Sequence, residues 1–597
     1  MMASKPKKQR PLPIISAVTR AAQFPDTFYA DGGVMFCRHC SHSVDYTRSD
    51  TVKDHLKSKK HLKNKELKSN PLLTGSEQGP TIPAAAARRQ TTLHSTMKSK
   101  DLREEFILDF VKCCTMADIP LHKVENMRPF ILKHCKQGGA LPKAETLRHL
   151  YIPRQFKIHL AALKEVVKGA KVSVIADETT DIRDHSILNV IVGVRGKYYL
   201  IDVCTMEACN HATLSQAVVK ALTNMDIKFD DVIAIVTDSA AYCKKAAREV
   251  LTPLLPNSRH VPCLAHIINL GAEAFQHYPE FGRVDTFTKM MKSAFFKKPA
   301  RKTRYLKYLK EYLPPDQCKL APAPVSTRWN SWYNAVKYHK EHLHVYEGFF
   351  KLEDSKGVAV ETILEMLRNK EIYSELELYM SFITEYSARL TTVLTSLEAT
   401  KKPLACTVYN ILEDTKTYLT TERTSFDQIN PLMEKRPAPE RQKLCKTFNK
   451  VFKAAADKIT KHLDQHPAMP FYKAARIFDP RQLVSISLDI DDYQHAIPDL
   501  TAAAIQTEEW LMYTHLNPSH IPEPLNLTEF WKSMSVRFPG LASIAMDAMW
   551  MPVSSVDVER SFSQYKHILD DKRENLTPEN TKMMTMLYYN ADVERQF

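Results

Sequence analysis

The sequence is poor in glycine and has no long apolar run. Glycine accounts for 14 of 597 residues, about 2% where about 7% is usual, and neither GxGxxG nor GxxxxGK[ST] occurs. The lack of such phosphate-binding loops excludes kinases, P-loop ATPases and dinucleotide-binding enzymes. No apolar run approaches the roughly 18 residues of a membrane span, and residues 1–13 lead into no apolar signal segment. We therefore expect neither a membrane protein nor a secreted one.

Acidic residues are too few to balance the basic ones. Lysine and arginine number 83, aspartate and glutamate 68, and the net charge is +15. Residues 1–65 hold 13 basic and 5 acidic residues, a local excess of 13 − 5 = +8. Such a basic field favours a polyanionic partner, although a solvated tail would carry the same charge. The 12 cysteines are irregularly spaced, which indicates a reducing compartment with thiols either buried or bound to metal.

Cysteine and histidine are spaced as zinc ligands near the start of the chain. Two residues separate Cys37 from Cys40, 14 separate Cys40 from His55, and five separate His55 from His61. Thiolate and imidazole ligands at this spacing are typical of a tetrahedral Zn²⁺ site, with the cysteines on a hairpin around 35–43. Two further histidines keep other ligand sets open, namely His39 and His42.

The two histidines of this motif are expected on one basic helix over residues 49–65. Ser49 or Asp50 would be its N-cap. The helix carries six lysines, and a zinc-fixed helix with this charge is suited to lie against DNA phosphates. The lysines that we expect to contact DNA are Lys53, Lys57 and Lys60.

Composition and periodicity divide the chain into segments. A basic disordered tail (1–30) holds the cluster KPKKQR at 5–10, which is typical of a nuclear import signal and predicts a nuclear location. A helical domain should contain helices over about 124–136, ended by Gly138 and Gly139, and 143–151, closed by Pro153. The segments after the tail are a zinc finger (31–66), a linker (67–100), this small helical domain (101–155), a core with strands (156–285), a helical insertion (286–530) and a closing helical region (531–597).

The core should contain a mixed sheet. Strands are predicted over 172–176, 186–194, 197–203, 232–237 and 259–262, with helices over 213–225, 240–251 and 264–275. Their order, βββαβαβα, predicts a meander followed by crossovers, with helices on the faces of the sheet.

Two of these strands end at an aspartate, Asp177 and Asp238. That edge of an open sheet is where sites form, and carboxylates suit Mg²⁺. A two-metal site needs three or more such carboxylates. Asp181 and Asp184 compete for the role of Asp177, and capping of turns is the commoner role for such aspartates.

Six segments resemble, in order, motifs of the hAT superfamily of DNA transposases. They are 175–181 (IADETTD), 237–241 (TDSAA), the pair Cys263-x2-His266, 326–329 (STRW), 475–481 (ARIFDPR), and 555–563 (SVDVERSFS) with Arg573, Leu576 and Asn590. The finger is similar to the BED-type fingers of the same superfamily. Residues 31–33, the finger and residues 106–153 also resemble the family of CGG triplet-repeat-binding proteins.

The resemblance implies a multidomain α+β protein. Its RNase H-like core would be interrupted by a large all-helical insertion and closed by a C-terminal dimerisation region. It supplies the third carboxylate, Glu559, so that Asp177, Asp238 and Glu559 would be catalytic and hold Mg²⁺ or Mn²⁺. Trp329 would stack on a flipped base, with burial in the insertion as the alternative and Trp332 as a competitor. Further DNA contacts are implied for Arg328, Cys263 and His266, although for the last two a packing role has equal weight.

The implied function is metal-dependent cleavage of transposon ends and strand transfer into target DNA. The partners would be double-stranded DNA, as terminal inverted repeats and target, and a second copy of the chain, in at least a dimer; no small-molecule substrate is expected. The family usually has Ser and Asn where this chain has Val558 and Tyr242. The alternative is a domesticated DNA-binding protein that acts in transcription or chromatin without cleavage.

Overall fold

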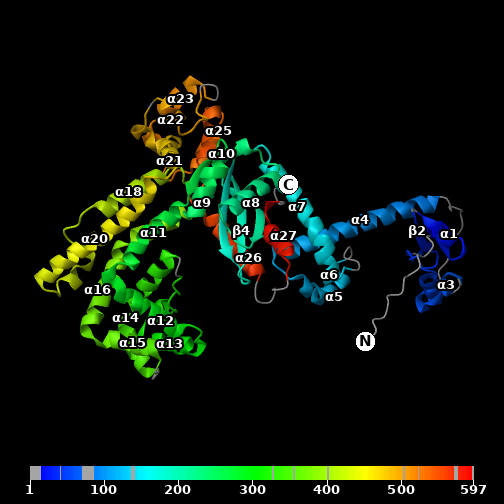
Figure 1. The fold of residues 1–597 in the computed structure, drawn as a ribbon, viewed down its shortest axis with the longest axis horizontal. Helices are drawn as coiled ribbons and strands as arrows, with labels where there is room; N and C mark the ends of the chain where they lie inside the picture. The colour runs from blue at the N-terminus through cyan, green and yellow to red at the C-terminus, as the bar shows by residue number, and fades with distance from the viewer. Residues whose placement is uncertain are drawn as a thin grey trace, which may run out of the picture. The chain divides into compact units, whose positions relative to one another are not determined.

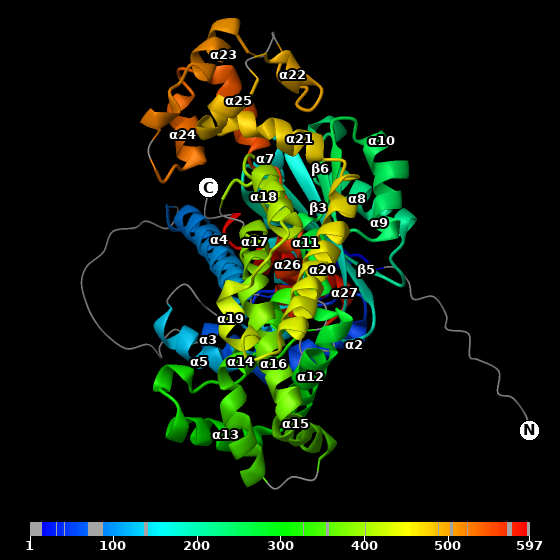
Figure 2. The same ribbon diagram turned by 90° about the vertical axis from the view of Figure 1, so that its left-hand side faces the viewer.

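The computed structural model describes residues 15–31, 33–40, 42–69, 87–135, 141–325, 328–353, 357–399, 402–487, 489–501, 505–521, 523–569 and 576–593. The chain falls into two compact units, Met1–Lys98 and Ser99–Phe597, drawn as ribbons in Figures 1 and 2. Within the described ranges, no helix is long and apolar enough to cross a membrane. Several residues of the sequence motifs lie outside those ranges: the 5–10 cluster, Gly138, Gly139, Ser326, Thr327 and Arg573.

The first unit is a β-hairpin packed with short helices. Helix α1 (Ala17–Ala21) precedes the antiparallel strands β1 (Phe28–Asp31) and β2 (Val34–Cys37), and helices α2 (Ser49–Lys57) and α3 (Lys59–Ser69) follow. The core of this unit is small, and its buried members are Ala17, Ala21, Phe28, Met35, Cys37, Val44 and Val52.

Two predictions for this unit are wrong. Residues 15–30 are not a disordered tail, because α1 and β1 contribute to the core. The helix predicted over 49–65 is interrupted at Ser58, which is extended (ψ 138°) and whose Oγ accepts a hydrogen bond from the N–H of His61 in place of a helical carbonyl. The residue at the N-cap is Arg48, which makes no side-chain cap hydrogen bond.

The helical segment before the sheet is longer than predicted. It comprises α4 (Ala87–Met116), α5 (Val124–His134), α6 (Ala144–Thr146) and α7 (Ile152–Val167). Part of the predicted linker 67–100 is therefore helical from Ala87 onward. Pro153 does not close the unit: a π-helical turn, Leu147–Tyr151, leads into α7 with Pro153 in its first turn, where a missing N–H costs little. The buried residues of α7 then run on into the core of the sheet.

A five-stranded mixed sheet lies at the centre of the second unit. Its strands are β3 (Val172–Thr180), β4 (Ser186–Val194), β5 (Lys197–Met206), β6 (Val232–Thr237) and β7 (Arg259–Pro262), in the spatial order β5-β4-β3-β6-β7. The pairs β5–β4 and β4–β3 are antiparallel, whereas β3–β6 and β6–β7 are parallel. The helices between them are α8 (His211–Asn224), α9 (Ala241–Ala246), α10 (Thr252–Leu254) and α11 (Leu264–Gln276). The predicted order βββαβαβα is confirmed.

Alternate side chains of the sheet belong to two different cores. Val172, Val174 and Ala176 of β3 pack with α7, α8 and α9 on one face. Ile175 belongs to the core on the opposite face, which includes Val558 of a helix from the C-terminal region. Because side chains of a strand alternate between faces, both faces of β3 are buried up to Ala176. Each fully buried Val or Ile contributes about 1.5–3 kcal/mol of transfer free energy, so β3 is firmly held.

A long helical segment separates the sheet from its last helices, and α12 begins at Gly282, four residues before the predicted start of the insertion. Figure 2 shows α11, α17, α18 and α20 side by side, and their buried residues join the core on the Ile175 face. The helices of this segment are α12 (Gly282–Phe295), α13 (Pro299–Tyr312), α14 (Trp329–Leu352), α15 (Val358–Arg368), α16 (Lys370–Tyr386), α17 (Ala388–Leu397), α18 (Val408–Thr420), α19 (Asn430–Met433), α20 (Ala438–Leu463), α21 (Met469–Ala475), α22 (Asp491–Gln494), α23 (Thr507–Thr514), α24 (Leu527–Met534) and α25 (Pro539–Ala548).

The chain then returns to the sheet. Helix α26 (Val556–Ile568) packs on β3 and β4, and α27 (Pro578–Tyr589) packs on β5 and α7. Asn590, just after α27, is buried and hydrogen-bonds the N–H and the carbonyl of Leu200 on β5. The last helices of the sequence are thus part of the core that begins with β3, which starts 384 residues before α26 (556 − 172).

Candidate metal and nucleic-acid sites

The finger brings its four predicted ligands together. The ligand atoms of Cys37, Cys40, His55 and His61 all lie within 4.8 Å of one another. The Nδ1 atom of His61 is 3.4 Å from Sγ of Cys37 and 3.5 Å from Sγ of Cys40. Tetrahedral zinc, with Zn–S of about 2.3 Å and Zn–N of about 2.0 Å, separates sulfur from nitrogen by about 3.5 Å. This is a Cys2His2 group of the zinc-binding kind.

Local structure explains how these ligands converge. Cys37 ends β2, and Cys40 lies in the turn that returns to Ser43, whose backbone bridges to Phe36. His55 is in α2 and Nε2 of its ring is buried with no hydrogen-bond partner among the described residues. A buried nitrogen without a donor or acceptor is costly unless a metal occupies it.

The competing histidines are not members of this group. Nδ1 of His42 is 3.0 Å from the carbonyl oxygen of Ser43, and His39 contacts His61 only edge-on, with ring centroids 5.5 Å apart. Burial, followed by the charge of neighbouring histidines, lowers the pKa of His55 and His61. Both imidazoles are therefore neutral near pH 7 and offer lone pairs. The predicted lysines Lys53, Lys57 and Lys60 are all exposed on α2 and α3.

In the core, the register of two parallel strands aligns Asp177 with Asp238. Ile175 of β3 pairs with Val236 of β6, so two residues farther along Asp177 is level with Asp238. Ile175 and Val236 both belong to the α26-side core, and alternation directs Asp177 to the same side. Strand β3 does not end at Asp177 as predicted but continues to Thr180, paired with β4.

The pKa of Asp177 reflects this neighbourhood. Burial of its carboxyl raises the pKa to about 8, and the negative charge of Asp238 adds to the effect, followed by smaller contributions from Glu559 and Glu178. Two carboxylates that repel each other in this way favour a bound cation.

Helix α26 carries Glu559 to the same face of the sheet. Asn189, the β4 residue paired with Asp177, donates a hydrogen bond of 2.7 Å to Oγ of Ser561 in α26. Both side chains are buried, so this bond fixes the position of α26 over the two strands. At the start of the same helix, the N–H of Ser555 donates to Sγ of Cys263 at 3.3 Å.

Glu559 itself is held by an arginine. Nη2 of Arg328 lies 2.5 Å from Oε2 of Glu559, and both side chains are partly exposed. Among the described residues, the finger ligands are the single set of three or more His, Cys, Asp or Glu with ligand atoms mutually within 4.8 Å. The three predicted carboxylates are therefore neighbours, but their oxygen atoms do not all lie within 4.8 Å of one another, as the ligand atoms of the finger do.

A second glutamate belongs to this neighbourhood and has no sequence signal. Burial, then the charge of Glu559, raises the pKa of Glu398, and its carbonyl accepts a hydrogen bond from Arg560. Glu178, next to Asp177, accepts a hydrogen bond of 3.0 Å from the hydroxyl of Tyr242. Tyr242 occupies the position at which the hAT pattern departs in this chain.

The remaining predicted DNA contacts differ in their placement. Trp329 is 1% exposed and packs against Phe275 and Trp332 at centroid distances of 6.2 and 5.1 Å. It cannot stack on a base in this structure, and the alternative, burial in the insertion, is correct. Cys263 is buried, so a packing role suits it, whereas His266 is exposed.

Asp181 has a structural role. Its Oδ1 accepts hydrogen bonds from the N–H groups of Arg183 and His185, which closes the turn between β3 and β4. Asp184 in that turn adopts φ 61°, as aspartate does in tight turns. Neither residue takes over the position of Asp177.

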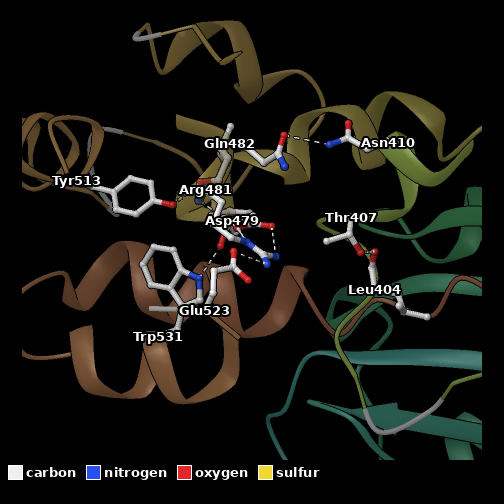
Figure 3. Close-up of polar contacts among 11 residues, drawn as sticks. Leu404, Thr407, Asn410, Asp479, Arg481, Gln482, Tyr513, Glu523 and Trp531 are labelled. Atoms are coloured by element: carbon white, nitrogen blue, oxygen red, sulfur yellow. Dashed lines mark hydrogen bonds and ion pairs between the residues drawn. The ribbon is translucent and has the colours of Figure 1, made fainter. Parts of the chain in front are cut away.

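The segment 475–481 organises the insertion. Buried Asp479 accepts hydrogen bonds from the backbone N–H and from the guanidinium of Arg481, as Figure 3 shows. The carbonyl of Phe478 accepts from Nε1 of Trp531 at 2.8 Å, and that of Ile477 accepts from the hydroxyl of Tyr513 at 2.5 Å. These contacts join α21, α23 and α24, so the motif is a structural one.

Comparisons with known proteins match different parts of the chain to different families. The family model of the hAT C-terminal dimerisation region matches residues 506–591, and that of a domain of unknown function, DUF659, matches 144–293. The CGGBP1 N-terminal domain matches 13–67 and the CGGBP1 helical domain 97–154. The human protein CGG triplet repeat-binding protein 1 is 32% identical over 141 residues, 23% of this chain and 79% of that protein, and the mouse protein gives the same values.

The N-terminal quarter of the chain belongs to the family of CGG triplet repeat-binding proteins. The C-terminal part contains the dimerisation region of the hAT family, which here comprises α23 to α27. The match to the CGGBP1 N-terminal domain begins at residue 13, in keeping with the ordered helix α1 and against a wholly disordered tail.

Proposed function

We propose that this protein is a hAT DNA transposase that cleaves transposon ends and transfers them to target DNA. The observation that carries the proposal is the level position of Asp177 and Asp238 on adjacent parallel strands, beneath the helix that holds Glu559. The order of the sheet, a three-stranded antiparallel meander followed by two parallel strands, supports an RNase H-like core.

Asp177, Asp238 and Glu559 would hold Mg²⁺ or Mn²⁺. Their oxygen atoms are the ligands that these hard cations prefer. Burial, followed by the negative charges of Asp238, Glu559 and Glu178, raises the pKa of Asp177, and a bound cation would offset both effects. When bound, the metal ions supply an activated nucleophile and stabilise the leaving oxygen. The Asn189–Ser561 hydrogen bond keeps α26 in register over the two aspartates.

Arg328 has a part of its own in this proposal. In the structure its guanidinium neutralises Glu559. A DNA phosphate offers the same bidentate acceptor geometry as a carboxylate. We infer that Arg328 moves from Glu559 to a phosphate when DNA binds, which leaves the carboxylate of Glu559 without this arginine as its ion-pair partner.

The N-terminal unit would be the DNA reader. Cys37, Cys40, His55 and His61 would hold Zn²⁺, which stabilises a unit with a very small core. The exposed lysines Lys53, Lys57 and Lys60 would then contact phosphates. The hAT dimerisation region supports a homodimer, and a transposase of this kind would act in the nucleus on terminal inverted repeats.

The test is a cleavage assay with the purified full-length chain. The substrate is a duplex that carries the terminal inverted repeats flanking its coding locus, and the control is a shuffled duplex of equal length. We expect cleavage at the repeat ends only, dependent on Mg²⁺ or Mn²⁺. Binding of the ends without cleavage under any divalent cation would contradict the enzyme.

That result would favour the second candidate, a domesticated protein that binds DNA and regulates transcription or chromatin. Two observations support it: Glu559 is already paired with Arg328, and the N-terminal quarter is related to a protein named for binding CGG triplet repeats.

A further inference from the structure

An open basic pocket lies along the free edge of the central sheet. It has a volume of about 570 Å³ and is lined by residues of β7, the edge strand, of the α9–α10 segment and of the turn after α20. Among the described residues that line it, none is acidic, whereas Lys244, Arg248 and Arg259 are cationic. Ser239, which also lines the pocket, directly follows Asp238.

Acidic side chains of the described residues balance the charge of the pocket only weakly. Lys244 forms no ion pair with any described residue and is exposed. Arg248 is 2.8 Å from Glu249, but both side chains are largely in solvent, where such a pair is weak. Arg259 is engaged elsewhere, with the carbonyl of Ala496 and the ring of Phe471.

Two hydroxyl groups in the pocket have no partner. The Oγ atoms of Ser239 and Ser258 are buried and make no hydrogen bond within the described part of the chain. Ser258 as a whole is 8% exposed. A buried hydroxyl without a partner costs free energy, so these atoms are placed to donate to a ligand that the pocket admits.

Two of the three histidines that line the pocket, His260 and His466, are already used by the protein. Nε2 of His260 is 2.9 Å from Oγ1 of Thr237, and Nε2 of His466 is 2.8 Å from the carbonyl oxygen of Pro262. These contacts fix the two rings against the strands and give the pocket a rigid wall. The groups left for a ligand include the hydroxyls of Ser239 and Ser258, the ammonium of Lys244 and the guanidinium of Arg248, which all donate hydrogen bonds and suit phosphate oxygens.

We propose that this pocket binds a phosphate group, and that in the DNA complex the group is a backbone phosphate of the strand being cleaved. The assignment of this phosphate to the cleaved DNA strand rests on the proposed function, because the proposed function places the scissile bond at Asp238, the neighbour of Ser239. The phosphate contact lies beside the metal site and holds the strand in register there.

The test uses the full-length chain and a fluorescently labelled duplex without divalent metal, so that its outcome does not depend on cleavage. Lys244→Ala is compared with Lys245→Ala. Lys245 is the next residue of the same helix and is also exposed, but it lies outside the pocket, 3.8 Å from Glu249. We expect Lys244→Ala to weaken binding about tenfold and to reduce the log–log salt slope by about one, with little change for Lys245→Ala.

A second arm separates DNA phosphate from free phosphate. The thermal midpoint is measured in sodium phosphate and in sodium chloride at matched ionic strength, for wild type, Lys244→Ala and Ser258→Ala. We expect phosphate to stabilise the wild type and neither variant, with all three equally folded by circular dichroism. Phosphate stabilisation that Lys244→Ala abolishes without any loss of DNA affinity would overturn the DNA assignment. Equal effects of Lys244→Ala and Lys245→Ala, or none, would overturn the pocket itself.

Discussion

The finger and the core each bring candidate metal ligands together, but they do so to different degrees. In the finger, four ligand atoms lie within 4.8 Å of one another. In the core, Asp177 and Asp238 are level on neighbouring strands, while Glu559 is turned to Arg328. The two sets differ in charge: a protonated thiol and an unprotonated imidazole are neutral, whereas each carboxylate is ionised unless its pKa is raised, as that of Asp177 is.

This difference has a physical consequence. Neutral thiols and imidazoles can approach one another closely because no charge repulsion opposes them. Carboxylates repel one another and need a positive charge among them, which Arg328 supplies to Glu559. The four finger ligands therefore lie at zinc-binding distances in this structure, whereas a cation and DNA together would complete the proposed site in the core.

Removal of zinc gives the largest effect that we expect. Zinc sites of this kind contribute about 10–16 kcal/mol at pH 7, more than the few buried residues of the first unit supply. A chelator should unfold residues 15–69, as measured by limited proteolysis and by the loss of one thermal transition. The second unit should remain folded, since its core holds none of these ligands.

Single substitutions sharpen this prediction. Cys40→Ser should unfold the finger in the same way and abolish its contribution to DNA affinity. His42→Ala is the matched control, because His42 is outside the ligand group. A finger that stays folded without zinc would contradict the view that the metal stabilises it.

The core should respond in activity rather than in folding. Asp177→Asn keeps the size of the side chain and removes its charge, so metal binding and cleavage should be lost by about a thousandfold. End binding should remain within a few tenths of a kcal/mol, a range that surface-like changes rarely exceed. The measurement is the single-turnover cleavage rate with saturating Mg²⁺.

The control for this substitution is Asp181→Asn. Asp181 accepts its backbone hydrogen bonds through Oδ1, an atom that asparagine retains, so the turn and the activity should both persist. Should Asp181→Asn lose cleavage while Asp177→Asn keeps it, the assignment of the two aspartates is reversed.

Much of the fold follows from local sequence. Strands β4, β6 and β7 begin and end at the predicted residues, and β4 and β6 do so because each is a largely apolar run bounded by turn-forming residues. Strand β3 is longer than predicted since its polar end, from Asp177 to Thr180, is held by pairing with β4. That partner is not visible in the composition of β3 itself. The continuation of α7 past Pro153 likewise depends on a π-helical turn that no periodicity indicates.

The candidate sites divide in the same way. The finger ligands are close in sequence, and their spacing alone predicts the group that the structure contains. Glu559 follows Asp238 by 321 residues (559 − 238). Only the resemblance to hAT transposases identifies it as the third carboxylate. The contacts of Arg328 with Glu559 and of Asn189 with Ser561 span 231 and 372 residues. No local pattern encodes such pairs, because tertiary packing alone brings their helices and strands together.

The smallest expected effect concerns the ion pair between Arg328 and Glu559, which distinguishes the candidate site in the core from that in the finger. Arg328→Ala frees Glu559 without changing its position on α26. The pair is largely solvated, with 62% and 40% of the side chains exposed, so its loss is worth at most about 1 kcal/mol. The Mg²⁺ concentration for half-maximal binding to the protein without DNA should therefore fall by up to about fivefold.

Arg560→Ala is the control for this change. Arg560 lies on the same helix and contacts Asp557 and the carbonyl of Glu398. The Arg560→Ala substitution removes the same positive charge from the neighbourhood of Glu559 and should leave the Mg²⁺ midpoint nearly unchanged. If both variants shift the midpoint equally, the effect is one of overall charge. If Arg328→Ala raises the Mg²⁺ midpoint instead, Arg328 supports metal binding. The core would then differ from the finger for a reason other than an arginine that competes with the metal.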